Sequence, residues 1–250
     1  MKKYVVFLLA ILLFAGCQKI TVMSYNVHAF RGMDRVLDAQ RIADVILAEK
    51  PDLVGLQEVD HLTARSEKFD AIAFFEAYTG MHVIYMKTFD YQGGAFGNMI
   101  LSRFPVIAEE EIRLPSRENY EPRLLMKVSV LTDRGDTLSF YNTHLDHHGT
   151  DSDRPAQMQK IADVIRKDSW PVILLGDLNC EPGSDEFKII DRVLTRCESD
   201  EMTYPADEPD RIIDHVLYST GRGLGCRSIK VVPEKVASDH RPVVARFRIR

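Results

Sequence analysis

Ten short strand-like segments run through nearly the whole chain, with only three amphipathic helical patterns between them. The expected strands cover residues 20–27, 52–59, 82–89, 97–102, 124–132, 137–145, 172–175, 212–218, 229–232 and 242–249. An alternating β/α barrel would need a helix after each strand. The pattern therefore predicts an α/β fold in which two sheets pack face to face, with helices outside and a single domain.

The three helical patterns are expected at residues 35–50, 153–167 and 184–195. Each places apolar side chains three or four positions apart, which is typical of a helix that covers a sheet. The apolar faces are Val36, Ala39, Ala43, Ile46 and Leu47; Met158, Ile161, Ala162 and Ile165; and Phe187, Ile190, Val193 and Leu194. Ser184 is a suitable N-cap for the third helix.

The first residues are typical of an export signal. Lys2 and Lys3 precede an apolar run, residues 5–15, which as a helix would span only about 16 Å, roughly half of a bilayer core. Phe14-Ala15-Gly16-Cys17 resembles a bacterial lipobox, in which cleavage precedes a lipid-modified cysteine. We therefore expect a lipoprotein signal peptide at residues 1–16 and an exported domain at 17–250, anchored to a membrane of the cell envelope through Cys17. A plain secreted protein is the alternative.

The net charge argues against a tight complex with nucleic acid. Without Lys2 and Lys3, 30 basic residues face 37 acidic ones, a net charge of −7. A protein that binds by neutralising many phosphates is expected to show a basic surplus. No stable nucleic-acid complex is expected, and the mature protein is expected to be a monomer.

Three cysteines follow Cys17, namely Cys180, Cys197 and Cys226. An exported protein can form disulfides, and three cysteines allow one bridge within the chain. If a bridge forms, Cys197–Cys226 is the favoured pair, because Cys180 directly follows a polar motif described below. Three buried thiols are the preferred interpretation.

Polar groups recur where the expected strands end. They are SYNVH at 24–28, LQEV at 56–59, NTHLD at 142–146, GDLN at 176–179 and IDH at 213–215, with SDH at 238–240 before the last strand. Any one group could be a turn, because Asp and Asn side chains bond to nearby backbone. Six such groups at strand ends, where α/β scaffolds gather catalytic residues, indicate one polar site.

Together with GNMILSRFP at 97–105, these motifs in this order resemble the endonuclease/exonuclease/phosphatase superfamily, which includes deoxyribonuclease I, inositol polyphosphate phosphatases and bacterial sphingomyelinases. The resemblance extends from residue 20 to residue 250. It implies a deoxyribonuclease I-like, four-layer α/β/β/α sandwich with the active site at one end of the two sheets. It also implies an enzyme that hydrolyses a phosphodiester or phosphomonoester by in-line attack of an activated water.

The resemblance implies a divalent metal ion, because a metal neutralises phosphoryl oxygens and steadies a poor leaving group. Carboxylate and amide ligands suit Mg²⁺, or Mn²⁺, better than Zn²⁺. The family pattern implies Glu58 as the metal ligand, supported by Asn26 and Asp239.

The catalytic residues that the resemblance implies are Asp177, Asn179, His144, Asp214 and His240. Asp177 would orient or deprotonate the attacking water, and Asn179 would fix that water or the phosphate. Asp214 would orient His240 and raise its pKa. Either His240 or His144, the second histidine, would stabilise or protonate a phosphoryl oxygen.

Three further residues are candidates for phosphate contact: Asn98, Arg123 and Arg154. A surface salt bridge is the alternative role for each arginine. The remaining histidines are expected to lie at the surface or to have local structural roles; they are His28, His61, His82, His147, His148 and His215.

The motifs report the phosphoryl chemistry and leave the rest of the substrate open. An acidic, exported, membrane-tethered chain without a basic-aromatic stripe favours a small or lipid-derived phosphoester. An extracytoplasmic nuclease is one alternative. A surface binding lipoprotein that kept the fold without catalysis is another, although such a protein would be expected to have lost polar residues that are all present here.

Overall fold

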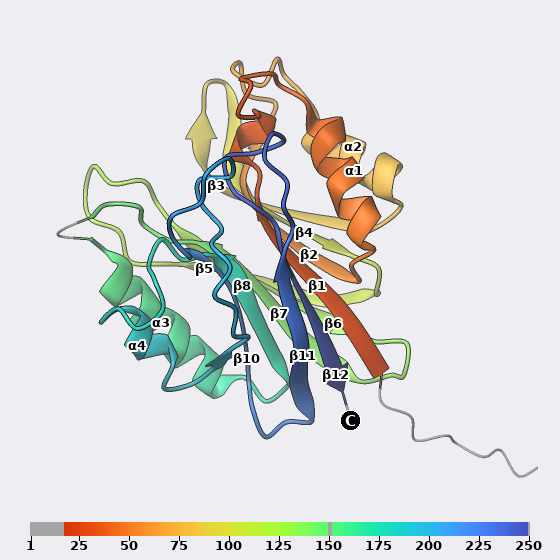
Figure 1. Ribbon diagram of the computed structural model, residues 1–250, viewed down its shortest axis with the longest axis vertical. Coiled ribbons are helices and arrows are strands. Elements are labelled where there is room, and N and C mark those ends of the chain that lie inside the picture. The colour runs from red at the N-terminus through yellow and green to blue at the C-terminus, as the bar shows by residue number, and fades with distance from the viewer. Residues whose placement is uncertain (1–17, 150–151, 250) are drawn as a thin grey trace, which may run out of the picture.

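The computed structural model describes residues 18–149 and 152–249 (Figure 1). The expected signal peptide and lipobox, residues 1–17, lie outside the described residues. Among the residues that are described, no helix has both the length and the apolar character needed to cross a membrane.

Two mixed six-stranded sheets form the body of the domain. The first has the order β11-β12-β1-β2-β4-β3 and the second the order β5-β6-β7-β8-β10-β9. The first sheet consists of β1 (Gln18–Asn26), β2 (Leu53–His61), β3 (His82–Tyr91), β4 (Gly94–Ser102), β11 (Leu224–Val231) and β12 (Val243–Ile249). The second consists of β5 (Val106–Arg113), β6 (Leu124–Leu131), β7 (Thr137–His144), β8 (Val172–Asp177), β9 (Thr195–Arg196) and β10 (Asp214–Tyr218). Each sheet contains one parallel pair, β1–β2 and β7–β8.

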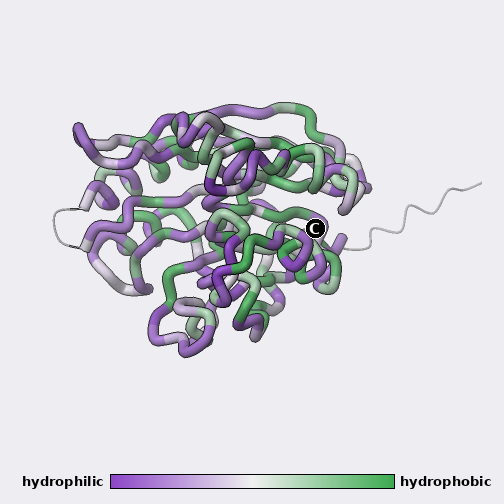
Figure 2. The backbone as a smooth tube through the Cα atoms, turned by 90° about the horizontal axis from the view of Figure 1, so that it is seen from above, coloured by the Kyte–Doolittle hydropathy of each residue, from purple (hydrophilic) through white to green (hydrophobic). Residues whose placement is uncertain are grey.

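Four helices cover the outer faces of the sheets. They are α1 (Ala39–Glu49), α2 (Ala71–Thr79), α3 (Arg154–Lys167) and α4 (Phe187–Ile190). One apolar cluster joins α1 and α2 to the first sheet, another joins α3 and α4 to the second, and a third fills the space between the sheets. The apolar segments accordingly run through the interior in Figure 2. The predicted four-layer α/β/β/α sandwich is confirmed.

Alternation along β1 shows how the sequence produces these layers. Ile20 and Val22 point into the space between the sheets, whereas Met23 and Tyr25 point towards the helices. Successive side chains of a strand face opposite sides, so an interior strand buried on both faces is apolar on both.

All ten expected strands are present, with bounds shifted by a few residues, but β5, β9, α2 and a short 3-10 helix (His28–Phe30) were not predicted. The strand β5 lies at the edge of its sheet and carries Glu109, Glu110 and Glu111, which blunt an exposed edge and hide the strand pattern. The helix α2 is apolar around most of its circumference, so it lacks an amphipathic period. The strand β9 has only two residues.

Two expected helices are shorter than predicted. The first begins after Asp38, whose side chain accepts a hydrogen bond from the backbone N–H of Arg41, so Val36 lies outside the helix and is 52% exposed. Ser184 Oγ accepts from the N–H of Phe187 as expected of a cap, yet the helix that follows ends at Ile190.

A buried polar contact sets the distance between the sheets. Asn142 in β7 accepts a hydrogen bond from Gln57 Nε2 at 2.7 Å and donates to the carbonyl oxygens of Leu56 and Met99. Gly55 lies opposite: a Cβ there would be 2.2 Å from Leu175 Cδ1 and 2.9 Å from Asn142 Cγ. Only glycine therefore allows β2 to approach the second sheet this closely.

One disulfide, Cys197–Cys226, is present among the described residues. The expected pair is therefore confirmed, and the expectation of three buried thiols was wrong. Cys180 is a free, buried thiol.

The close approach at Gly55 predicts that Gly55→Ala destabilises the domain. Overpacking a well-packed interior costs about 1–3 kcal/mol, which corresponds to a fall in Tm of about 2–4 °C for each kcal/mol in a chain of this size. Gly225→Ala in β11 is the matched control, because its Cβ would meet nothing within 4 Å. Equal midpoints for the two variants in thermal unfolding would contradict the importance of this contact.

Candidate active site

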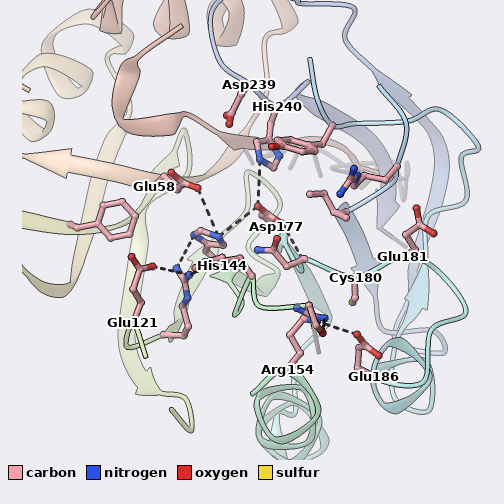
Figure 3. Close-up of a pocket in the computed structure, with 18 of the residues that line it drawn as sticks. Glu58, Glu121, His144, Arg154, Asp177, Cys180, Glu181, Glu186, Asp239 and His240 are labelled. Atoms are coloured by element: carbon pink, nitrogen blue, oxygen red, sulfur yellow. Dashed lines mark hydrogen bonds and ion pairs between the residues drawn. The ribbon is translucent and has the colours of Figure 1, made fainter. Parts of the chain in front are cut away.

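The predicted site residues converge at one end of the two sheets. Strand pairing places His144 beside Asp177 and Asp177 beside Asp214 in the second sheet, while Asn26 pairs with Gln57, next to Glu58, in the first. A cavity of about 960 Å³ opens at this end (Figure 3). Its lining includes Glu58, Arg123, His144, Arg154, Asp177, Asn179, Asp239 and His240.

Local backbone irregularities turn two of these side chains into the cavity. A β-bulge interrupts the pairing of β2 with β4 between Leu56 and Val59, and Glu58 within it has a φ of 57°. Asn179, just after β8, has a φ of 50°. Bulges re-aim side chains, and positive φ at residues other than glycine is a strain that concentrates at functional sites.

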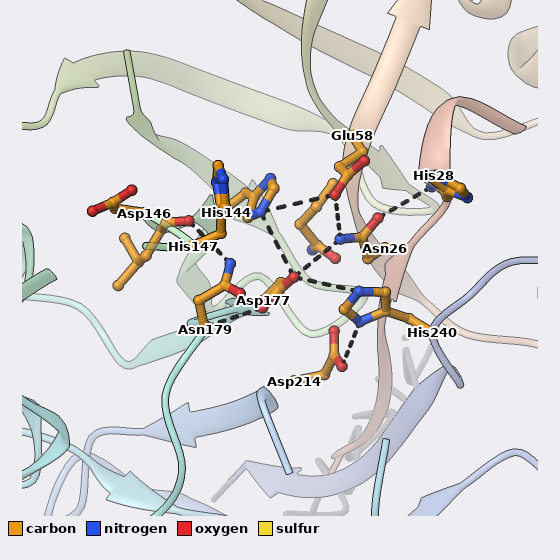
Figure 4. Close-up of polar contacts among 12 residues, drawn as sticks. Asn26, His28, Glu58, His144, Asp146, His147, Asp177, Asn179, Asp214 and His240 are labelled. Carbon is orange, nitrogen blue, oxygen red and sulfur yellow. Dashed lines mark hydrogen bonds and ion pairs between the residues drawn. The ribbon is translucent and has the colours of Figure 1, made fainter. Parts of the chain in front are cut away.

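Asp177 lies at the centre of the cluster (Figure 4). Its Oδ2 accepts a hydrogen bond from Asn26 Nδ2 at 3.0 Å and lies 3.6 Å from His240 Nε2 and 3.7 Å from His144 Nε2. Its Oδ1 accepts from the backbone N–H of Asn179 at 3.0 Å. One carboxylate therefore joins residues from both sheets.

His240 is held as a cation. Its Nδ1 lies 2.9 Å from Asp214 Oδ2, in the arrangement expected from the sequence. Burial opposes the charged ring, but the carboxylates of Asp214 and Asp177 outweigh it and raise the pKa of His240 to about 10.

The pKa of Asp177 is also raised. Burial raises the pKa of this carboxyl to about 7, against the pull of the His240 cation and with a further rise from Asp214. A carboxyl with this pKa can exchange a proton near neutral pH.

His144 is neutral, and Arg123 selects its tautomer. Burial, with help from the positive charge of Arg123, lowers the pKa of His144 well below its ordinary value. The guanidinium N–H of Arg123 lies 3.1 Å from His144 Nδ1, and because arginine can only donate, Nδ1 must accept. The remaining proton therefore sits on Nε2, which faces Glu58 at 3.9 Å and Asp177 at 3.7 Å.

The charge balance of the cluster suits a divalent cation. The carboxylates of Glu58, Asp177, Asp214 and Asp239 lie at the cavity or directly behind it, and within the described residues the bases at salt-bridge distance from them are three histidines, His28, His144 and His240. Buried negative charge without compensation is costly. Glu58 and Asp239 have side chains that are 25% and 24% exposed, so their oxygens remain accessible to an ion.

Asn26 joins two carboxylates of the site by hydrogen bonds. Its Nδ2 donates to Glu58 Oε1 and to Asp177 Oδ2, both at 3.0 Å, while its Oδ1 accepts from the N–H of His28. Asn26 thus fixes the spacing of the two carboxylates. Its role as a metal ligand stays a prediction.

Two other groups of acidic and histidine side chains are close enough to hold a metal: Asp177 with Asp214 and His240, and Asp146 with His147 and His148. In the first, the protonated His240 cannot be a ligand. In the second, Asp146 already accepts from His148 and from the N–H of Asp153. Glu58 belongs to neither group, and its role as the metal ligand stays a prediction.

The three candidates for phosphate contact differ in position. Arg123 is buried in the cavity wall and pairs with Glu121 at 3.0 Å. Arg154 also lines the cavity, but it donates to the carbonyl oxygens of Asp146 and His148 and pairs with Glu186. Asn98 is buried in β4 and is absent from the described lining residues.

His147, expected at the surface or in a local structural role, is exposed as expected and also lines the cavity, where its Nδ1 lies 3.2 Å from Arg123 NH2. The position of His147 directly after the NTHLD motif could have indicated that it lies near the site. Tyr204, whose ring packs against His240 at 4.6 Å, carried no such signal because it belongs to no motif.

Comparison with known proteins places this arrangement in a family. A family model described as the Endonuclease/Exonuclease/phosphatase family matches residues 23–240. Three solved structures have a similar fold. A family protein from Beutenbergia cavernae has a TM-score of 0.72 at 22% identity, covering 92% of this chain and 72% of its own.

The other two structures carry functional names. A mannosyl-6-phosphatase from Bacteroides thetaiotaomicron has a TM-score of 0.72 at 19% identity, covering 91% of this chain and 99% of its own. The human Nocturnin catalytic domain with a bound sulfate anion has a TM-score of 0.75 at 21% identity. The match covers 93% of this chain and 95% of that domain. Identities this low show a common fold.

The carboxylates around His240 predict its titration. In the metal-free protein, the His240 ring should stay protonated at pH 8, because its pKa is about 10. Asp214→Asn removes one negative charge and should lower this pKa by about 1–3. Both values can be measured by NMR of the imidazole ring. A wild-type pKa near the ordinary 6.5 would show that burial, and not the carboxylates, dominates.

Proposed function

The chain belongs to the endonuclease/exonuclease/phosphatase family, and we propose that it is a Mg²⁺-dependent phosphoesterase that hydrolyses a small phosphomonoester or phosphodiester. The observation that carries the proposal is the position of Asp177. This carboxylate lies between His144 and His240 in one cavity with Glu58, so a base, two hydrogen-bond donors and a metal ligand face the same space.

Glu58 and Asp239 are the residues proposed to hold the ion. A hard divalent cation bound there supplies positive charge for the phosphoryl oxygens and for the departing oxygen. Mn²⁺ has the same preference for oxygen ligands and is expected to replace Mg²⁺.

Asp177 and Asn179 are proposed to hold the attacking water. The N–H of Asn179 fixes the Asp177 carboxylate, and the side chain of Asn179 is itself held by a bond from Nδ2 to the carbonyl oxygen of Leu145 at 3.1 Å. The pKa of about 7 lets Asp177 take a proton from that water near neutral pH.

The two histidines are proposed to have different tasks. His144 is neutral and offers Nε2–H, so it can hydrogen-bond a phosphoryl oxygen while keeping its proton. His240 is cationic, so it can stabilise the charge that develops on the phosphoryl group and supply a proton to the leaving oxygen. Asp214 keeps His240 charged and oriented.

The cavity wall favours a small substrate over a nucleic acid. Every arginine among its described residues already pairs with a carboxylate: Arg65 with Asp60, Arg123 with Glu121, Arg154 with Glu186 and Arg211 with Asp210. A nuclease needs basic side chains for the phosphates that flank the cleaved one. The phosphatase name of the Bacteroides relative is consistent with a single small phosphate ester.

We further propose that the mature domain, residues 17–250, is exported and held at a cell-envelope membrane by a lipid on Cys17. The apolar run and the lipobox-like residues support this location. Recovery of the full-length protein in the soluble fraction after ultracentrifugation would contradict it.

Catalysis should depend on Asp177 and on the metal. Asp177→Asn is expected to lower kcat by at least ~10²-fold, the range typical of a lost acid-base or electrostatic group, and EDTA should abolish the wild-type activity. The assay is Mg²⁺-dependent hydrolysis of p-nitrophenyl phosphate and bis(p-nitrophenyl) phosphate.

Asp163→Asn on the exposed face of α3 is the control and should retain wild-type turnover. Full activity of Asp177→Asn would reject the assigned base. A well-folded wild-type protein that is inert with Mg²⁺ and Mn²⁺ on a broad phosphoester panel would favour the non-catalytic binding protein.

A further inference from the structure

The end of the domain opposite the cavity is built from the other set of strand termini. We call it the basal pole and define it by the start of β1 at Gln18 and by the turns at residues 103–105, 132–136, 168–171 and 219–223. Gln18 pairs with Ile249, and Ile249 pairs with Leu224, directly after the last of these turns. Arg103 bonds to Asp52 and Asp133, which links the turns of the two sheets at this pole.

β1 connects the basal pole to the active site. It starts at Gln18 in the basal pole and ends at Asn26, whose side chain contacts Asp177 and Glu58. Eight steps of a strand at about 3.3 Å each place the two ends roughly 26 Å apart. Figure 1 shows β1 running from the side of the C-terminus towards the opposite end of the sheets.

A lipid on Cys17 would have almost no linker. Cys17 precedes Gln18 by one peptide bond, so their Cα atoms are about 3.8 Å apart, and Gln18 is already paired in the sheet. β1 is also an interior strand, with β12 on one side and β2 on the other. The described chain therefore begins on an interior strand at the basal pole, next to the residue that would carry the lipid.

We propose that the basal pole rests on the membrane that holds the Cys17 lipid, so that the active-site cavity faces away from that membrane. The proposal rests on the lipid anchor and the phosphoesterase activity proposed above, and it specifies the source of the substrate. The phosphate of a lipid in the same membrane lies about 26 Å below the cavity. The substrate is then a water-soluble phosphoester, which selects the small over the lipid-derived class.

The surface chemistry of the two poles agrees with this orientation. Trp170, in the turn before β8, is 48% exposed, and its carbonyl oxygen accepts a hydrogen bond from the exposed Arg222 at 2.6 Å. Leu131, at the end of β6 in the same pole, is also exposed. Tryptophan and arginine both favour the interface between lipid and water.

The lining of the cavity pairs carboxylates with arginines, namely Glu121 with Arg123, Glu186 with Arg154 and Asp210 with Arg211. The one tryptophan of the chain lies at the other pole.

Trp170 is the only tryptophan in the chain, so its emission reports on the basal pole alone. The full-length, lipid-modified protein would be reconstituted into phosphatidylcholine/phosphatidylglycerol vesicles with and without a headgroup-nitroxide lipid. The expected result is a loss of Trp170 emission with the nitroxide lipid. In Cys17→Ser, the emission should be insensitive and the protein should not sediment with the vesicles.

A tryptophan placed at the active-site end tests whether that end lies away from the membrane. Leu62 is an exposed residue just beyond β2, at the active-site end. The double variant Trp170→Phe/Leu62→Trp should sediment with the vesicles and keep its emission. Stronger quenching at position 62 than at position 170, or equal quenching at both, would overturn the orientation, and so would a lipid-bearing wild type that fails to sediment.

Hydrolysis of p-nitrophenyl phosphate by the same vesicles separates the orientation from the activity. Quenching at Trp170 without hydrolysis would reject the phosphoesterase and, with it, the substrate assignment, while the membrane contact would stand. Hydrolysis without quenching would reject the membrane contact and leave the enzyme intact.

Discussion

The distance between the two sheets determines how close the active-site residues of one sheet lie to those of the other. Gly55 lets β2 approach β7 and β8, and the bond from Gln57 to Asn142 fixes the sheets at that spacing. The same spacing brings Asn26 of the first sheet within 3.0 Å of Asp177 of the second. A buried polar bond between apolar faces tolerates little displacement, because an unpaired amide there would be costly. The interior packing thereby positions the catalytic groups.

Unequal environments then give similar side chains different roles. His240 lies between two carboxylates and stays charged, whereas His144 lies beside Arg123 and stays neutral. Asp177 has been moved towards neutrality by burial, whereas Glu58 is more exposed and keeps oxygens open to the cavity. A base, a cation, a neutral donor and a metal ligand can thus arise from two histidines and two carboxylates.

The sequence predicted ten of the twelve strands among the described residues and the convergence of most candidate site residues in one cavity, because apolar alternation and strand-end motifs are local patterns. The sequence did not predict features that depend on contacts between segments distant in the chain. β5 is an edge strand whose glutamates conceal it, and α2 has no polar face. The roles of Arg154 and Asn98 depend on the direction of their side chains, and Arg154 turns to three carbonyl oxygens of its own loop. His147 lines the cavity, where its Nδ1 lies 3.2 Å from Arg123 NH2, a contact that no local pattern predicts.

We propose that side chains from both sheets form one catalytic cavity and that a divalent metal is held in it at Glu58. Anomalous diffraction from a crystal soaked in Mn²⁺ tests it most directly. We expect a peak at coordination distance, about 2.0–2.6 Å, from a Glu58 carboxylate oxygen, and loss of that peak in Glu58→Gln. A peak confined to Asp146, His147 and His148, or one that persists unchanged in Glu58→Gln, would contradict it.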